Sequence, residues 1–205
     1  MSRVLLATRN AKKLGELRRL LGAQVQVLGL AHVPAFEEQP ETGASFEENA
    51  IAKAVQAAGA TGEISLADDS GLAVDALNGM PGVLSARWSG RHGNDAANNA
   101  LLLAQIAEVP GARRGAAFVC ALALAVPGEA PLVVKGEWRG RIRLEPAGVN
   151  GFGYDPLFVP GESDAAGDGR SSAELAPEEK DALSHRGRAI TAMVPALRRT
   201  LARRS

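Results

Sequence analysis

Two adjacent aspartates inside an apolar stretch constrain the fold of this chain more than any other feature. Asp68 and Asp69 lie between the apolar runs 64–67 and 72–74, and a Ser-Gly pair follows them directly. Burying a charge is unfavourable unless a metal or a cation compensates it, and a carboxylate pair held in this way often binds Mg²⁺ against a phosphate substrate. The sequence predicts two strands joined by a turn, with both aspartates as metal ligands. The structural alternative is a strand end whose aspartates cap a turn or pair with arginines.

Length and composition predict a single domain over residues 1–205. The chain has 46% hydrophobic and 22% charged residues, and its formal net charge is zero, which argues against nucleic acid or an anionic membrane as a partner. A strand-like run starts the chain without a signal peptide, and no apolar run is long enough to cross a membrane. We therefore expect a cytoplasmic protein. The single cysteine, Cys120, is expected to be a small buried hydrophobe.

Hydrophobic periodicity predicts an α/β fold with a mixed sheet flanked by helices. The helix over 11–21 has an apolar face of Leu14, Leu17, Leu20 and Leu21 and is expected to end at Gly22. A second helix is expected to begin after Ser45 and to stop at Gly59. The other expected helices cover 95–108, a segment starting at Pro177, and 184–201; the expected strands cover 3–7, 25–28, 64–67, 72–74, 115–126 and 134–145.

The segment between the first strand and the first helix has the residues of a phosphate-binding loop. Backbone N–H groups at a helix N-terminus favour phosphate, and short polar side chains and a lysine stand beside them. The spacing is not that of a Walker A loop. The alternative is an Asn10 N-cap with solvated lysines. The predicted phosphate-binding residues are Thr8, Arg9, Asn10, Ala11, Lys12 and Lys13.

The segment from Glu41 to Lys53 is ambiguous. Ser45 and Glu48 are explained by a capping box without any function. Asn49 and Lys53 are compatible with a solvated helix face, whereas Glu41 precedes the helix and could approach a metal.

Two segments near the C-terminus carry groups that suit a nucleoside. Residues 151–156 place two aromatics in a Gly-rich loop, where a ring can stack on a base; the alternative is a hydrophobic turn that fills the core. The second segment, residues 180–186, offers ammonium, hydroxyl, imidazole and guanidinium donors for an anion or a purine carbonyl. The alternative is a helix junction with Ser184 as N-cap. The predicted residues are Phe152, Gly153, Tyr154, Asp155, Lys180, Ser184, His185 and Arg186.

Taken in order, these segments resemble the inosine triphosphate pyrophosphatase family, whose members hydrolyse dITP, ITP and XTP. The resemblance covers nearly the whole chain. The segments that carry it are Thr8-x-Asn10-x-x-Lys13, Glu41-Thr42-Gly43, Phe46-Glu47-Glu48-Asn49-Ala50, Ala67-Asp68-Asp69-Ser70-Gly71-Leu72, Pro81-Gly82 with Ser85-Ala86-Arg87, Phe152-Gly153-Tyr154-Asp155-Pro156, and Ser184-His185-Arg186.

The resemblance implies a two-lobed fold on a long mixed sheet, with the substrate in a cleft between the lobes. It also implies a homodimer, a Mg²⁺ requirement, and hydrolysis of the triphosphate to the monophosphate and pyrophosphate. Asp69 matches the residue that binds Mg²⁺ and accepts a proton, Asp68 supports it, and Ser70 matches a substrate contact. The 8–13 loop matches the phosphate site, and residues 152–155, Lys180, His185 and Arg186 match the nucleoside site.

Two positions depart from the family pattern. Arg9 stands where the family usually has glycine, and Pro40 stands where it has a metal-binding glutamate. Glu37, Glu38, Glu41 or water is expected to take the place of that glutamate. Two other functions stay open: a related pyrophosphatase for modified pyrimidine or methylated nucleotides, and a nucleotide sensor without turnover.

Overall fold

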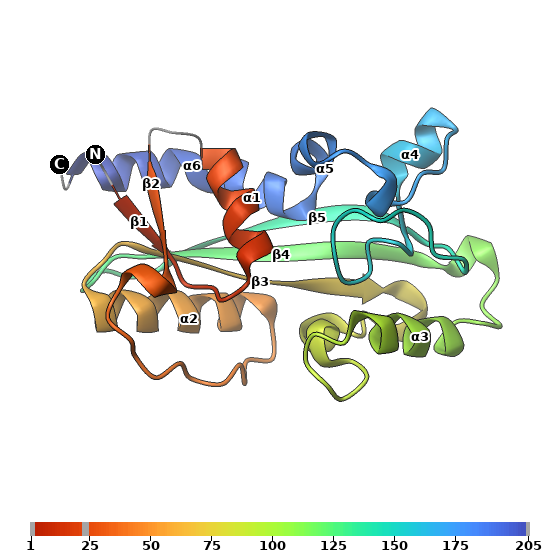
Figure 1. The fold of residues 1–205 in the computed structure, drawn as a ribbon, viewed down its shortest axis with the longest axis horizontal. Helices are drawn as coiled ribbons and strands as arrows, with labels where there is room; N and C mark the ends of the chain where they lie inside the picture. Colours follow the sequence, from red (N-terminus) through yellow and green to blue (C-terminus); the bar gives the residue numbers. More distant parts are fainter. Residues whose placement is uncertain (1–2, 22–24, 204–205) are drawn as a thin grey trace. The chain divides into compact units, whose positions relative to one another are not determined.

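The computed structural model describes residues 3–21 and 25–203, and Figure 1 shows their fold. The predicted helix end at Gly22 lies outside the described residues. The side chains of Leu17, Leu20 and Leu21 are not described either, so the structure does not test the apolar face expected from them. Leu14, the remaining member of that face, packs against a hydrophobic core.

A mixed six-stranded sheet forms the centre of the fold, which confirms the predicted α/β class. Its strand order is β2-β1-β3-β4-β5-β6. β1 pairs in parallel with both β2 and β3, whereas β5 and β6 pair antiparallel. The strands are β1 (Arg3–Leu6), β2 (Gln26–Gly29), β3 (Ser65–Val74), β4 (Gly115–Ala125), β5 (Leu132–Ile142) and β6 (Phe158–Pro160).

Six α-helices connect or flank the described strands. Among the described residues, none of the helices combines the length and the hydrophobicity needed to cross a membrane. The helices are α1 (Ala11–Leu21), α2 (Phe46–Thr61), α3 (Asp95–Gln105), α4 (Gly161–Ala166), α5 (Pro177–Leu183) and α6 (His185–Arg203), and short 3₁₀ helices cover Leu30–His32, Asp75–Leu77, Gly82–Arg87, Gly111–Arg113 and Ser172–Glu174.

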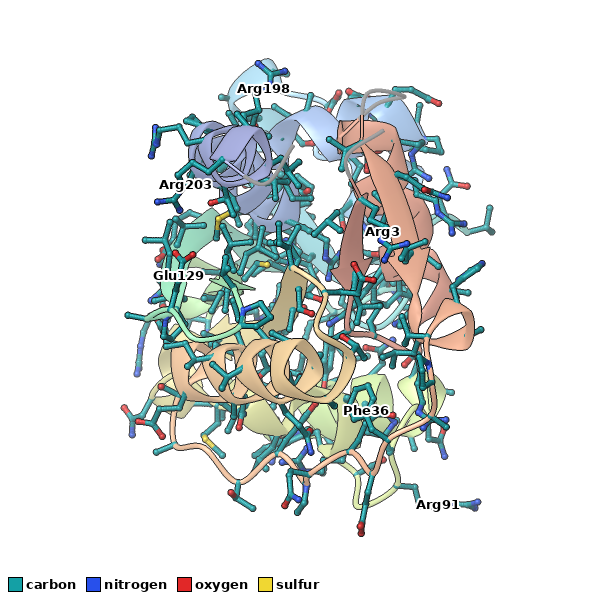
Figure 2. All side chains as sticks on the ribbon, turned by 90° about the vertical axis from the view of Figure 1, so that its left-hand side faces the viewer. Arg3, Phe36, Arg91, Glu129, Arg198 and Arg203 are labelled. Atoms are coloured by element: carbon teal, nitrogen blue, oxygen red, sulfur yellow. The ribbon has the colours of Figure 1, made fainter. Side chains whose placement is uncertain are left out.

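The described residues divide into two compact units. The first unit contains the described parts of segments 1–69, 120–136 and 186–205. Its core joins side chains of β1, β3, β4 and α6, including Leu6, Leu66, Leu122 and Met193. Helices α2 and α6 cover opposite faces of its strands (Figure 1). Figure 2 labels Arg203 of α6 and Glu129, and a guanidinium nitrogen of Arg203 lies 3.4 Å from a carboxylate oxygen of Glu129.

The second unit contains segments 70–119 and 137–185 and has its own core. That core is built around the fully buried Trp138, Phe158, Leu72 and Leu102. The rings of Phe118 and Phe158 meet edge to face at 4.7 Å. Since each unit buries its own apolar cluster, each supports a separate set of the predicted site residues.

Strand β3 contradicts the predicted pair of short strands joined by a turn. It runs without a break from Ser65 to Val74, so the segment Asp68–Gly71 is extended. The two charges are tolerated inside the strand because cationic and amide side chains surround them, as described below. The backbone of Gly71 is closely approached by other residues: a Cβ atom there would lie 2.6 Å from the carbonyl oxygen of Gly82 and would also collide with Ser85.

Helix α2 starts as predicted but ends later. Ser45 accepts a hydrogen bond from the Glu48 N–H at 3.2 Å, whereas the Glu48 side chain accepts from the N–H of Ala44. The prediction of a stop at Gly59 is wrong, because the helix continues to Thr61. Gly62, with φ of +73°, is the left-handed residue that ends it. The short elements β6 and α4 have no counterpart in the sequence prediction.

Gly71→Ala is expected to destabilise the protein by about 1–3 kcal/mol, because its methyl group would collide with backbone that cannot move independently. Gly59→Ala is the matched control, since nothing lies within 4 Å of the added Cβ atom. In the helix interior this substitution is expected to stabilise by about 0.5–1 kcal/mol. Urea unfolding measures both values. Equal effects of the two substitutions would contradict the close approach at Gly71.

Candidate active site

The parallel pairing of β1 and β3 places the predicted phosphate loop beside the two aspartates. Leu6 is the register partner of Leu66, and the Ala7 N–H donates to the Leu66 carbonyl at 2.8 Å. The chain leaves β1 directly after this pair and enters α1 at Ala11, while β3 continues into Asp68. Because β1 ends beside Leu66 while the parallel strand β3 continues, the N-terminus of α1 and the carboxylates come together.

Asp68 forms a buried ion-pair cluster with two cations. Its Oδ2 atom lies 2.8 Å from Lys13 Nζ and 3.4 Å from Arg186 Nε. Burial alone would raise the pKa of Asp68, but the charges of Lys13 and Arg186 outweigh burial and hold this pKa well below its ordinary value. Asp68 therefore stays ionised and ties the start of α1 and the start of α6 to β3.

Asp69 has a separate set of partners, as expected for neighbouring residues on a strand, whose side chains point to opposite faces. Its Oδ2 atom accepts from Asn49 Nδ2 at 2.9 Å, and its Oδ1 atom lies 3.4 Å from Lys53 Nζ. Burial raises the pKa of Asp69, and the charge of Glu41 adds to this effect, while Lys53 and Asn49 oppose it. A carboxylate with a raised pKa is suited to accept a proton.

Glu41 meets Asp69 at the ammonium group of Lys53. Lys53 Nζ lies 2.6 Å from Glu41 Oε1 and 3.4 Å from Asp69 Oδ1. Burial would lower the pKa of Lys53, but the charges of Asp69 and Glu41 raise it. Asn49 fixes the segment that carries Glu41, since its Oδ1 atom accepts from the Gly43 N–H at 2.8 Å. Two carboxylates thus converge on a single cation.

This donor set suits a cation that keeps part of its water shell. No three carboxylate, histidine or cysteine side chains gather into a metal cage among the described residues. Mg²⁺ is commonly bound by one or two carboxylates together with substrate phosphates and water, and Glu41 and Asp69 supply two. Of the other candidates near Pro40, Glu37 is exposed and Glu38 pairs with Arg9 at 2.5 Å.

The loop from Thr8 to Lys13 is organised by its own side chains. Thr8 Oγ1 accepts from the Asn10 N–H at 3.1 Å, and Asn10 Oδ1 accepts from the Lys13 N–H at 3.3 Å. Asn10 therefore caps α1, which was the structural alternative, while Lys13 turns to Asp68. Arg9 is exposed, and Ala11 is the first residue of α1. The side chain of the remaining loop residue, Lys12, lies outside the described part of the chain.

In the second unit, Asp155 organises the aromatic loop. Its Oδ2 atom lies 2.5 Å from Lys180 Nζ and accepts from the Phe152 N–H at 2.8 Å, and its Oδ1 atom accepts from Ser172 Oγ at 2.7 Å. Lys180 Nζ also lies 5.5 Å from the centre of the Phe152 ring. Asp155 and Lys180 thus hold the loop together, and the half-buried Phe152 ring is the part of it that can stack on a base.

The other predicted residues of this unit differ in accessibility. Tyr154 is buried, and its hydroxyl donates to the Ser85 carbonyl at 2.9 Å. The His185 ring is buried and stacks on Phe118 at 4.9 Å. Ser184 joins α5 to α6, and Ser70 is half-buried in β3. The sequence does not distinguish Tyr154 from Phe152 as the ring that contacts a base, whereas the structure buries Tyr154 and leaves Phe152 half-buried.

Residues 4–196 match the sequence profile of the Ham1 family. The chain belongs to the Ham1 family. A curated dITP/XTP pyrophosphatase of Nocardia farcinica is 63% identical over 201 residues, which cover 96% of this chain and 95% of that protein. The resemblance drawn from the sequence motifs is thereby confirmed.

Solved structures support the same conclusion for the fold. A nucleoside-triphosphatase / dITP/XTP pyrophosphatase of Mycobacterium abscessus is 61% identical, with a TM-score of 0.77 over 94% of this chain and 99% of that chain. A HAM1 protein of Coxiella burnetii is 41% identical, with a TM-score of 0.83 over 97% of this chain and 100% of that chain.

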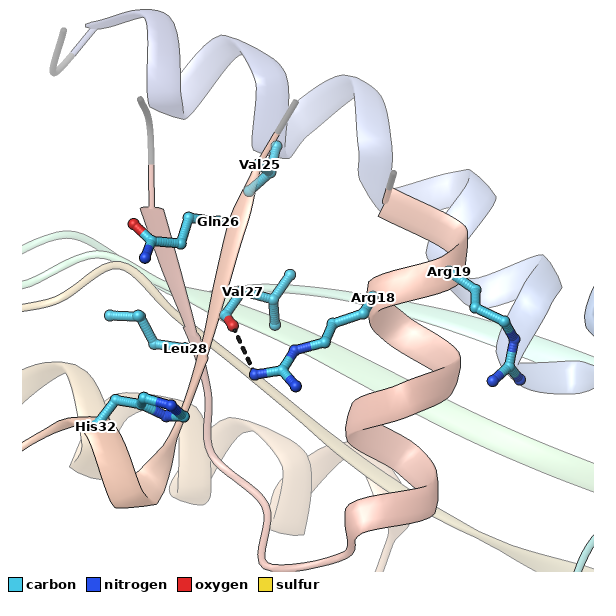
Figure 3. Close-up of a pocket in the computed structure, with 7 residues that line it drawn as sticks. All are labelled: Arg18, Arg19, Val25, Gln26, Val27, Leu28 and His32. Atoms are coloured by element: carbon cyan, nitrogen blue, oxygen red, sulfur yellow. Dashed lines mark hydrogen bonds between the residues drawn. The ribbon is translucent and has the colours of Figure 1, made fainter. Parts of the chain in front are cut away.

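One pocket of this Ham1 family member is lined mainly by residues of α1 and β2. Its volume is about 590 Å³, and its described lining contains none of the predicted site residues. Figure 3 shows Arg18 donating to the Val27 carbonyl at 3.2 Å, and Arg19 also lines this pocket. A pocket of about 430 Å³ instead borders the loop residues Thr8 to Ala11 and the segment 29–38.

The sequence patterns alone do not single out Asn49, Lys53 or Glu41 as site residues. Asn49 and Lys53 are four residues apart and share one face of α2, which is equally typical of a solvated helix. The distinguishing signal is burial, since Asn49 is only 2% exposed. A buried asparagine needs a partner, and here the partner is the Asp69 carboxylate.

Asp68→Asn is expected to destabilise the metal-free protein by about 3 kcal/mol at pH 7, because two buried cations lose their counter-charge. The low pKa of folded Asp68 means that its charge stabilises the fold above the ordinary value of about 3.9. This contribution fades as the pH falls through the folded pKa. The difference from the wild type, measured by urea unfolding in chelator, should therefore shrink below pH 4.

Asp164→Asn is the matched control for this prediction. Asp164 pairs with Arg141 through two hydrogen bonds at 2.7 and 2.8 Å, but both side chains are exposed. Its substitution is expected to cost less than about 1 kcal/mol. Equal losses in the two variants at pH 7 would contradict a special role for the buried Asp68 cluster.

Proposed function

We propose that this chain hydrolyses nonstandard purine nucleoside triphosphates, namely dITP, XTP and ITP, to the monophosphate and pyrophosphate. The activity after which its relatives are named supports this proposal. The observation that carries it is the convergence of Glu41 and Asp69 on one cation beside the N-terminal loop of α1. Such an arrangement suits a divalent metal and a phosphate chain together.

We propose Mg²⁺ as the metal, with Glu41 and Asp69 as its protein ligands. When bound, Mg²⁺ supplies charge neutralisation for the phosphate oxygens and orients the attacking water. Asp68 is a weaker candidate than the sequence prediction made it, because Lys13 and Arg186 already neutralise its carboxylate. We assign Asp68 instead to holding Lys13 in place.

Asp69 is the proposed proton acceptor. Asn49 fixes its Oδ2 atom, and in the metal-free protein burial raises the pKa of its carboxylate above that of an exposed aspartate. As water adds to phosphorus, its proton passes to Asp69, and the P–O bond to the pyrophosphate leaving group breaks. Lys13 and the backbone N–H groups at the start of α1 stabilise the negative charge that develops on the phosphates.

The aromatic loop and the C-terminal cluster are proposed to bind the purine. Phe152 offers a ring face for stacking, and donors from His185 and Arg186 would meet the 6-oxo group of hypoxanthine or xanthine. Adenine carries a donor at that position, so two donors would face each other, at a cost of a few kcal/mol.

Family resemblance also leads us to propose a homodimer in the cytoplasm.

Pyrophosphate release from a panel of nucleotides tests the function. We expect ITP, dITP and XTP to exceed ATP, dTTP and UTP in kcat/KM by at least about 10²-fold, with no release when Mg²⁺ is chelated. Asp69→Asn should abolish turnover, because it removes both a charged ligand and the base, while the thermal midpoint stays close to that of the wild type.

Three results would overturn this proposal. Preference for dTTP or UTP would select the pyrimidine-type pyrophosphatase. Tight binding of ITP without pyrophosphate release would select a nucleotide sensor. Near-normal ITP hydrolysis by Asp69→Asn would remove the proposed base.

Glu41→Gln tests the second metal ligand. Loss of one of two charged ligands is expected to raise the Mg²⁺ concentration for half-maximal ITP hydrolysis by roughly 10- to 100-fold. Glu38→Gln is the control, since this nearby carboxylate pairs with Arg9. A Mg²⁺ titration of both variants gives the comparison. If Glu38→Gln moved the titration and Glu41→Gln did not, the ligand assignment would be reversed.

A further inference from the structure

Both polar backbone groups of Gly153 are bound by one face of α3. The Gly153 N–H donates to Asp95 Oδ2 at 2.7 Å, and the Gly153 carbonyl accepts from Asn99 Nδ2 at 3.0 Å. Asp95 and Asn99 are four residues apart and therefore lie on the same side of the helix. Gly153 has a φ of +62°, a conformation that side chains disfavour. The helix thus fixes the residue at which the aromatic loop turns.

Helix α3 is itself anchored to the segment that holds Tyr154. Asn98 is buried, and its side chain accepts from the Ser89 N–H at 2.8 Å and donates to the Ala86 carbonyl at 3.3 Å. The Tyr154 hydroxyl reaches the carbonyl of Ser85 in the same segment. The aromatic loop is therefore fixed both through its backbone and through the buried tyrosine.

We propose that Asp95 and Asn99 are positioning residues, which hold the peptide groups on both sides of Gly153 so that Phe152 presents its ring to the purine. This inference rests on the proposed function for the identity of the ligand. Phe152 directly precedes the bound peptide, so rotation of that peptide would move its ring. Neither α3 residue needs to touch substrate. Their effect is expected on purine affinity and selectivity rather than on the chemical step.

Asp95→Ala and Asn99→Ala test the proposal by steady-state kinetics with ITP and ATP. Loss of either hydrogen bond is expected to raise the KM for ITP roughly three- to ten-fold, with kcat changed less than about two-fold. The ITP-to-ATP ratio of kcat/KM should fall by a similar factor. Because both residues hold Gly153, through the peptide groups on its two sides, the double variant should lose less than the product of the single losses.

Two further variants separate positioning from general stability. Asp95→Asn keeps an oxygen that can accept from the Gly153 N–H, so it should restore most of the affinity lost in Asp95→Ala. Gln105→Ala removes an amide from the same helix whose described partner is Trp88, and it should leave KM and selectivity unchanged. KM and selectivity changes in Gln105→Ala equal to those in Asn99→Ala would overturn the proposal.

A readout without substrate keeps the test independent of the proposed function. Tyr154 is the only tyrosine of the chain, so 3-fluorotyrosine labelling gives a single ¹⁹F resonance beside the bound peptide. This resonance should shift or broaden in Asp95→Ala and Asn99→Ala and stay in place in Gln105→Ala. An unchanged resonance in both alanine variants would overturn the positioning role. A wild type that fails to hydrolyse ITP, with the expected ¹⁹F changes, would overturn only the proposed function.

Discussion

The buried carboxylate of Asp68 is the interaction on which the first unit depends. It draws the ammonium of Lys13 and the guanidinium of Arg186 to the middle of β3, so three segments far apart in the chain meet at one charge. Without these cations a carboxylate in a buried strand would be strongly unfavourable. With them β3 can continue, and the next residue, Asp69, is presented on the opposite side. Structural and chemical roles are thereby divided between two neighbouring aspartates.

Much of the fold follows from local sequence pattern, whereas the continuity of β3 does not. Periodicity alone predicts α1, β4 and β5 to within a few residues. At the two aspartates the same pattern suggests a break, because their compensating charges lie elsewhere in the chain, at Lys13 and Arg186. The three-residue β6 and the six-residue α4 are too short for any periodicity to indicate. Local signals therefore fail where tertiary partners decide the conformation.

The residue types of the candidate site were predictable from the sequence, but the hydrogen bonds and ion pairs between these residues were not. The phosphate loop and the two aspartates stand out in the sequence, yet a capping box and a polar helix face look alike whether or not they serve a site. Only burial shows that Asn49 turns to Asp69. Asp155 gives the converse case: it resembles a ligand for a base or ribose, and the structure supplies it with Lys180, Ser172 and the Phe152 N–H as donors.

The unbroken β3 strand sets how freely this chain can vary in length. Neighbouring strand residues face opposite ways, so one residue inserted ahead of Asp68 would exchange the faces of both aspartates. The carboxylate meant for Lys13 would then face Lys53, and the proposed base would be enclosed by the other two cations. In the irregular segment before α2, side chains do not alternate between two faces, so an added residue there can bulge outward without exchanging the faces of its neighbours. Length changes should therefore accumulate ahead of α2 and be absent from the five residues 65–69.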